Sequence, residues 1–126
     1  MAYIRLFSLV IAALSIGAAP ALAERIASKQ AFVEKVAGKK LTERNRHGAT
    51  PRGWMTIEAN GRISGQTPNL GSITGTWNWK DRFYCRNLIV DAVAVPPDCL
   101  TVSVKGNEAI FTRHRGNGLA DIWTIE

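Results

Sequence analysis

The segment at residues 71–86 limits the possible folds of this chain more than any other part of the sequence. Its first half alternates polar and apolar residues with a period of two, which is typical of a half-buried β-strand. One face of that strand would carry Ile73, Gly75, Trp77 and Trp79. A polar break at residues 80–82 is followed by a second strand-prone run at 83–86. The segment therefore predicts a β-hairpin whose inner face carries two tryptophans.

Short strand-prone runs lie on both sides of this hairpin, and turn-forming residues separate them. The clearest turn is Asn60-Gly61, a dipeptide typical of two-residue hairpin loops. The runs are residues 39–44, 54–59, 62–64, 71–80, 83–91, 99–104, 109–113 and 120–125. They predict a mainly β protein with an antiparallel up-and-down meander of about seven to eight strands. We expect the meander to close into a small barrel or a curved sheet, with a two-sheet β-sandwich as the alternative.

One helix is expected, at residues 28–38 near the N-terminus. Ser28 is a suitable N-cap, and Gly38 stands where a left-handed residue ends a helix. The apolar stripe of this helix consists of Phe32, Val33, Val36 and Ala37. A helix this short is marginal alone. We therefore expect the stripe to dock on the sheet as a lid or plug.

Residues 1–23 have the pattern of a signal peptide. A short basic start precedes an apolar run, and Ala21-Leu22-Ala23 is the small-residue pattern that precedes cleavage. Cleavage after Ala23 would leave residues 24–126 as a single β-rich domain that is periplasmic or secreted and does not span the membrane; an uncleaved N-terminal anchor is the alternative. No nucleic-acid partner is expected, because the chain has no long runs of lysine or arginine.

The two cysteines, Cys85 and Cys99, predict a disulfide, because an exported protein meets an oxidising compartment. A loop of about 15 residues closed in this way should add about 3 kcal/mol of stability. Free or reactive thiols are the alternative. Within the loop, residues 92–98 contain Pro96-Pro97 and are expected to be irregular, since proline cannot serve a central strand.

Two groups of side chains are candidates for binding. The formal net charge of +6 favours anionic partners. Cations at strand ends could form an anion-binding rim: Lys80, Arg82, Arg86, Arg113 and Arg115. Indole rings could line a ligand pocket: Trp54, Trp77, Trp79 and Trp123. Ordinary solvated strand ends and an ordinary aromatic core are the alternatives for the two groups.

No pattern of catalytic or cofactor-binding residues stands out. The only histidines, His47 and His114, lack metal-ligand spacing, so no metal is expected. The segment 116–121 begins like a dinucleotide fingerprint but lacks its third glycine and a following helix, and no cofactor is expected. The leading hypothesis is a non-catalytic module that binds a small or anionic ligand. The alternatives are an inhibitor or envelope-interaction module, using a loop such as 45–53, and an enzyme.

Gly75-Thr76-Trp77 resembles the G-x-W motif of lipocalins, and residues 73–77 resemble the opening strand of avidin-type barrels. Both resemblances imply a closed ligand-binding barrel. In those families the motif lies near the start of the barrel, whereas here it lies past the middle of the chain. No binding residues are therefore transferred from either family.

A longer likeness covers nearly all of residues 24–126. The motifs that carry it lie at residues 32–42, 61–65, 75–79, 83–86, 98–99 and 111–113. It resembles a group of small exported bacterial proteins with no established activity, some of which are labelled dihydrodipicolinate reductase. That label implies a nicotinamide-binding half with a glycine-rich strand-to-helix turn and a parallel sheet. The sequence predicts neither, and export does not fit a cytoplasmic reductase.

Overall fold

Antiparallel strands make up most of the structure, a computed structural model that describes residues 22–44 and 52–126. The strands are β1 (Glu24–Arg25), β2 (Lys40–Glu43), β3 (Trp54–Ile57), β4 (Arg62–Gln66), β5 (Ser72–Lys80), β6 (Phe83–Val90), β7 (Val93–Ala94), β8 (Asp98–Lys105), β9 (Glu108–Thr112) and β10 (Ala120–Ile125). The helices are α1 (Lys29–Lys35) and the short 3-10 helix η1 (His114–Gly116). Most of the predicted signal peptide and residues 45–51 of the predicted interaction loop lie outside these ranges.

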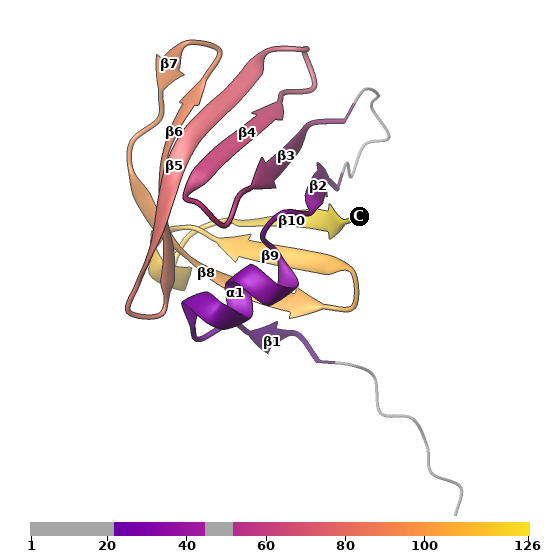
Figure 1. Cartoon of the computed structure of the whole chain (residues 1–126), viewed down its shortest axis with the longest axis vertical. Coiled ribbons are helices and arrows are strands. Elements are labelled where there is room, and N and C mark those ends of the chain that lie inside the picture. Colours follow the sequence, from indigo (N-terminus) through magenta and orange to yellow (C-terminus); the bar gives the residue numbers. More distant parts are fainter. Residues whose placement is uncertain (1–21, 45–51) are drawn as a thin grey trace, which may run out of the picture.

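Eight of the strands form a closed barrel, β2 to β6 and β8 to β10. Consecutive barrel strands pair along the sheet, and β10 closes it by pairing with β2. Figure 1 shows β4, β5 and β6 side by side in the upper half and β8, β9 and β10 across the lower half. The predicted barrel is confirmed, and the β-sandwich alternative is not realised. Closure leaves the eight strands without an exposed barrel edge.

The hairpin of β5 and β6 has the predicted alternation. Ile73 and Trp77 on β5 are buried, while Thr74 and Thr76 are exposed. In the register, Trp77 lies opposite Arg86 and Trp79 lies opposite Tyr84, so all four side chains lie on the inner side of the wall. Gly75 is required here because a Cβ atom would overlap the backbone carbonyl oxygen of Asn87.

The segment 92–98 is more regular than the sequence predicts. Val93 and Ala94 form β7, which folds back onto the outer end of β6. The turn between the two strands consists of Asp91 and Ala92, both with positive φ (51° and 64°). The proline constraint acts only at Pro96-Pro97, which leaves the two residues of β7 free to pair.

The helix closes one end of the barrel. Its N-cap is Ser28, whose Oγ accepts a hydrogen bond from the backbone N–H of Ala31 at 3.2 Å. Phe32 and Val36 are completely buried, and Phe32 lies against the inner aromatic rings of β5 and β6. In Figure 1, α1 lies at the lower part of the barrel and β7 at the upper part. The predicted plug is therefore present, because the short helix gains its stability from the barrel core.

The predicted disulfide joins Cys85 on β6 to Cys99 on β8. The two residues lie directly opposite each other in the register, with their Cα atoms 4.0 Å apart. Their neighbours Tyr84 and Leu100 face the core, which places the disulfide on the outer face of the wall. The chain leaves the barrel after β6, forms β7 and returns as β8. The disulfide therefore joins the two barrel strands on either side of this excursion.

Within residues 22–44 and 52–126, neither helix has the length and apolar composition needed to cross a bilayer.

Candidate ligand-binding cavity

The barrel contains a cavity of about 300 Å³ at the end opposite α1. The residues that line it lie at the strand ends farthest from the helix. Examples are Glu43 on β2, Gln66 on β4, Val90 on β6 and Asp121 on β10. Apolar side chains form much of the wall: Met55, Ile73, Leu88, Val90, Leu100, Phe111 and Trp123. These side chains belong to the inner face that the period-2 alternation predicts. The barrel core is therefore solid near the helix and hollow toward the other end.

Tyr84 lines this cavity and has a buried polar group without a partner. Its side chain is 2% exposed, and its hydroxyl has no hydrogen-bond partner among the described residues. Burial raises the pKa of the Tyr84 phenol well above its usual range, and the positive charge of Arg86 opposes this only in part. The hydroxyl is therefore protonated at neutral pH. Leaving such a group unpaired costs about 1–3 kcal/mol.

Arg86 lies two residues along β6 from Tyr84 and also lines the cavity. Its side chain donates a long hydrogen bond, 3.5 Å, from Nη1 to the backbone oxygen of Pro96. Within the described ranges, none of the ion pairs involves Arg86. Asp98, its partner in the β6–β8 register, accepts hydrogen bonds from the backbone N–H groups of Cys99 and His114 instead.

Two carboxylates and a second arginine also line the cavity. Arg113 forms an ion pair with Asp121, with Nε and Oδ2 3.0 Å apart. Glu43 lies at the end of β2, which is four strands away from β6 in either direction around the barrel. Glu43 and Arg86 thus occupy opposite walls. The positive charge of Arg113 is locally compensated, whereas the charges of Arg86 and Glu43 are separated across the cavity.

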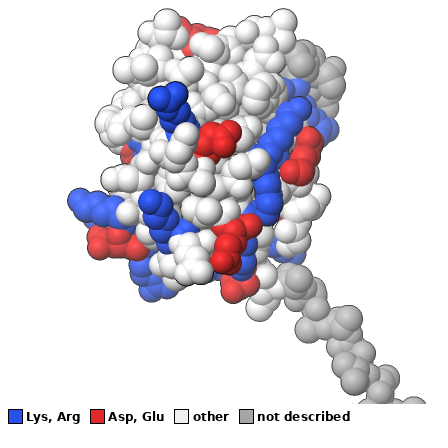
Figure 2. Space-filling model, viewed as in Figure 1, with Lys and Arg blue, Asp and Glu red and all other residues white. Residues whose placement is uncertain are grey.

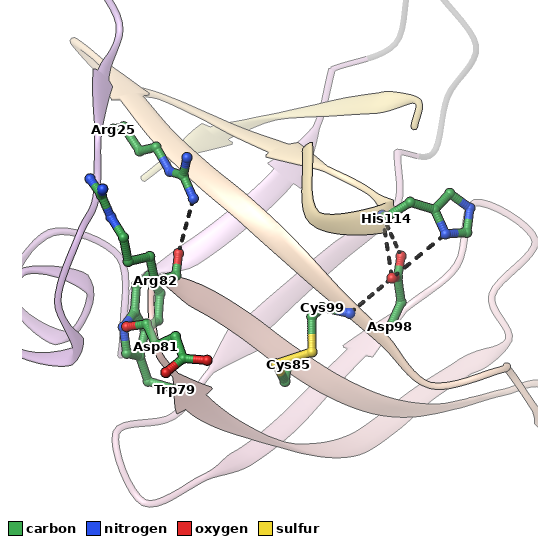
Figure 3. Close-up of a disulfide and its surroundings, with 8 residues drawn as sticks. All are labelled: Arg25, Trp79, Asp81, Arg82, Cys85, Asp98, Cys99 and His114. Carbon is green, nitrogen blue, oxygen red and sulfur yellow. Dashed lines mark hydrogen bonds and ion pairs between the residues drawn. A yellow bond between two sulfur atoms is a disulfide. The ribbon is translucent and has the colours of Figure 1, made fainter. Parts of the chain in front are cut away.

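A second hollow, of about 470 Å³, lies on the outer surface beside the disulfide. Arg86 and Asp98 line it together with η1, where His114 and Arg115 both have positive φ (53° and 54°). The Asp98 carboxylate holds this turn, since Oδ2 accepts the backbone N–H of His114 at 3.1 Å. Figure 3 shows Asp98 and His114 on one side of the disulfide and Arg25 and Arg82 on the other. Arg86 lines both this outer hollow and the cavity.

The predicted anion-binding cations do not share one rim. Arg86 and Arg113 line the cavity, whereas Arg115 lies outside, with its guanidinium 5.6 Å from the Phe83 ring centroid. Arg25, which sequence reasoning missed, lies 5.5 Å from the same centroid and donates to the backbone oxygen of Arg82. Lys80, at the end of β5, is exposed. Figure 2 shows basic and acidic side chains interspersed on the face that carries α1.

The four tryptophans have different environments, and one of them, Trp123, lines the cavity. Trp77 is core, 6% exposed, and its Nε1 donates to the backbone oxygen of Glu58 at 2.7 Å. Trp79 packs on Phe32 near the plug, with ring centroids 5.5 Å apart. Trp54 faces outward and donates from Nε1 to Gln66 at 3.3 Å.

Tyr84 is the cavity residue that sequence reasoning missed. The alternation of β6 places Tyr84, Arg86 and Leu88 on one face, so the signal was present in the sequence. Of the histidines weighed as metal ligands, His47 lies outside the described residues. Across the part of the chain that the structure describes, no group of three or more His, Cys, Asp or Glu side chains is placed to hold a metal ion.

Comparisons of the chain with protein-family models, with curated proteins and with solved structures find no match.

Proposed function

We propose that this protein binds a small, largely apolar molecule in the barrel cavity. The observation that carries the proposal is the Tyr84 hydroxyl, which is buried without a partner in the lining of an apolar-walled cavity. A buried polar group of this kind calls for a partner that the chain itself does not supply among the described residues. A bound molecule with a hydrogen-bonding group would supply it after a small tilt of the Tyr84 ring toward the cavity, since the hydroxyl has almost no accessible surface in this structure.

The size and position of the cavity support this function. Small-molecule sites are concave, largely apolar and carry a few polar groups, and they begin at about 300 Å³. The mouths of β-barrels are a common place for such sites. Because α1 fills the opposite end, the ligand would enter from the end formed by Gln66, Val90 and Asp121. The closed sheet holds the cavity walls in place before the ligand binds.

We assign the protein no catalytic role. The reductase label carried by some of the similar exported proteins requires a parallel dinucleotide-binding sheet. Each strand pair in the described residues is antiparallel, from the β1–β8 pair to the β8–β9 pair. Binding without chemistry is therefore the function that the barrel supports best.

We place the protein in the periplasm or outside the cell, as one of the small exported proteins that its sequence resembles. The disulfide between Cys85 and Cys99 supports this location, because disulfides persist in oxidising compartments. Most of the loop proposed for an inhibitor or envelope-interaction role, residues 45–53, lies outside the described ranges. The cavity, and not this loop, carries the present proposal.

The test is displacement of an apolar fluorophore by cavity filling. N-phenyl-1-naphthylamine is titrated into purified protein, and its emission is followed as it enters an apolar site. Leu88→Trp places a large ring in the cavity lining, whereas Ile89→Trp places the same ring on the adjacent, exposed position of β6. We expect the first variant to lose at least about tenfold in affinity, equivalent to 1.4 kcal/mol, and the second to bind as the wild type.

Circular dichroism melting establishes that both variants are folded. If the fluorophore does not bind the wild-type protein, or binds Leu88→Trp and Ile89→Trp equally well, the cavity is not a binding site and the proposal is wrong.

A further inference from the structure

The walls of the cavity differ in charge, and this difference indicates the class of ligand. The β6 wall carries Tyr84 and Arg86, and the β2 wall, four strands away in either direction, carries Glu43. Arg113 is already paired with Asp121 at 3.0 Å. Arg86, which has no carboxylate partner among the described residues, therefore lies on the same strand face as Tyr84, whose hydroxyl has no hydrogen-bond partner among them. A ligand that satisfied both groups would need an acceptor with negative charge.

We propose that the ligand is an aliphatic or aromatic carboxylic acid, bound as its carboxylate between the Tyr84 hydroxyl and the Arg86 guanidinium, with its apolar body against Leu88, Leu100 and Phe111. This inference rests on the proposed function of the cavity. The Tyr84 O–H would donate one hydrogen bond, and the guanidinium would donate others in the fork geometry that suits a carboxylate.

The neighbouring groups favour this orientation. Tyr84 stays protonated at neutral pH because burial raises the pKa of its phenol, so the hydroxyl can donate. Among the described residues Asp98 does not pair with Arg86, and its carboxylate instead accepts the backbone N–H groups of Cys99 and His114 at 2.8 and 3.1 Å. The hydrogen bond from Arg86 to Pro96 is long, 3.5 Å, and leaves the remaining guanidinium donors for a ligand. Glu43 on the opposite wall would repel the acidic end and so orient the molecule toward β6.

The experiment compares three probes with the same alkyl chain: octanoate, octanol and octylammonium. Each displaces N-phenyl-1-naphthylamine from the wild-type protein at pH 7 and low salt. We expect octanoate to compete at a concentration about tenfold lower than octanol, because the difference in free energy between a hydrogen bond to a charged group and a neutral one corresponds to about that factor. Octylammonium should be the weakest competitor, because Arg86 repels it.

Four variants test the roles of individual side chains. Arg86→Gln should abolish the preference for octanoate over octanol. Tyr84→Phe should weaken octanoate by about three- to tenfold and weaken octanol by a smaller factor, because a neutral hydrogen bond contributes less than one to a charged group. Glu43→Gln should strengthen octanoate binding. Lys80→Gln, which removes the same charge from an exposed side chain outside the cavity, is the matched control and should keep the preference.

The outcomes separate the two proposals. If the fluorophore binds and octanoate and octanol compete equally, the carboxylate inference is wrong and the cavity proposal stands. If Lys80→Gln reduces the preference as much as Arg86→Gln does, the effect is general electrostatics and the inference is also wrong. If the fluorophore does not bind at all, the proposed function itself fails. If Arg86→Gln does not fold, Arg86→Lys replaces it in the test. Lysine keeps the positive charge but cannot donate two parallel hydrogen bonds to a carboxylate. Loss of the preference for octanoate in Arg86→Lys would support the inference, and an unchanged preference would contradict the role of the guanidinium.

Discussion

The ring of Phe32, from α1, stacks on the ring of Tyr84, from β6, with centroids 5.3 Å apart and planes inclined by 22°. This contact joins the plug of the barrel to the floor of the cavity, because Tyr84 also lines the cavity. Trp77 completes the cluster, 4.9 Å from Phe32 and 5.9 Å from Tyr84. The helix therefore supports the residue on which the proposed binding site depends.

We predict that Phe32→Ala destabilises the protein by about 3–5 kcal/mol, the usual range for removing a buried aromatic ring. The loss includes the transfer free energy of the ring and the cavity left among Trp77, Trp79 and Tyr84. Urea unfolding followed by tryptophan fluorescence measures it. Gln30→Ala, on the exposed side of the same helix, is the control and should change stability by less than about 0.5 kcal/mol. Equal effects of the two substitutions would contradict the plug role.

Replacement of both cysteines by serine should lower the free energy of unfolding by about 3 kcal/mol, because the closed loop of about 15 residues no longer restricts the unfolded chain. Because the disulfide lies on the outer face of β6 and β8, the folded variant should still bind the fluorophore. Urea unfolding of the wild type with and without reductant checks the magnitude. A variant that folds with an unchanged midpoint would show that the bond contributes nothing to stability.

The stability difference between wild type and Tyr84→Phe should depend on alkaline pH. The folded protein holds the Tyr84 proton above the usual pKa of tyrosine, near 10, because burial raises the pKa. The unfolded chain releases that proton above pH 10, so the wild type loses stability as pH rises, by about 1.4 kcal/mol per pH unit. Tyr84→Phe lacks this loss. At neutral pH its stability should equal or exceed that of the wild type, because the unpaired hydroxyl is gone.

Urea unfolding of both proteins at pH 7, 10 and 10.5 gives the comparison, and other alkaline titrations cancel between them. Parallel losses of stability in the two proteins would mean that Tyr84 is not held protonated by the fold.

Ala92→Gly should stabilise the protein by about 1 kcal/mol. Ala92 has φ of 64° in the two-residue turn between β6 and β7, a region that costs residues with a Cβ atom about 1–2 kcal/mol and glycine almost nothing. The change creates Asp-Gly, a preferred sequence for this type of turn. Thermal melting measures the shift. Val93→Gly, one residue further along in β7, should not stabilise; a gain in both variants would point to a cause other than turn strain.

Much of the fold follows from local patterns in the sequence. The alternation around Trp77 and the cap at Ser28 each involve residues close together in the chain, and the structure has them as predicted. The hairpin turn at Asn60-Gly61 is also present, but it is longer than two residues: Glu58 donates its backbone N–H to the Arg62 oxygen at 2.8 Å, and only Gly61 of the dipeptide has positive φ. The disulfide was predictable because the chain has two cysteines in all. The β7 strand was not, because its pairing depends on a turn in which Asp91 and Ala92 adopt a conformation unusual for both residues.

The candidate site was less predictable, for a physical reason. The side chains of Arg82, Arg86 and Arg115 are alike in sequence, but their surroundings depend on pairings between distant segments. Arg86, paired with Asp98 in the β6–β8 register, lines both the cavity and the outer hollow, while Arg115 reaches Phe83 from η1. The four tryptophans likewise divide among core, plug, outer wall and cavity.

The amino-acid sequence by itself determined the class of secondary structure, the helix cap and the partners of the disulfide. The first two depend on neighbouring residues, and a chain with two cysteines allows a single pairing. Only the tertiary structure decided that the meander closes, through the pairing of β10 with β2, and that α1 fills one end and leaves the other hollow. Those outcomes depend on how side chains from opposite walls fill a shared volume. That volume exists only once the barrel has closed.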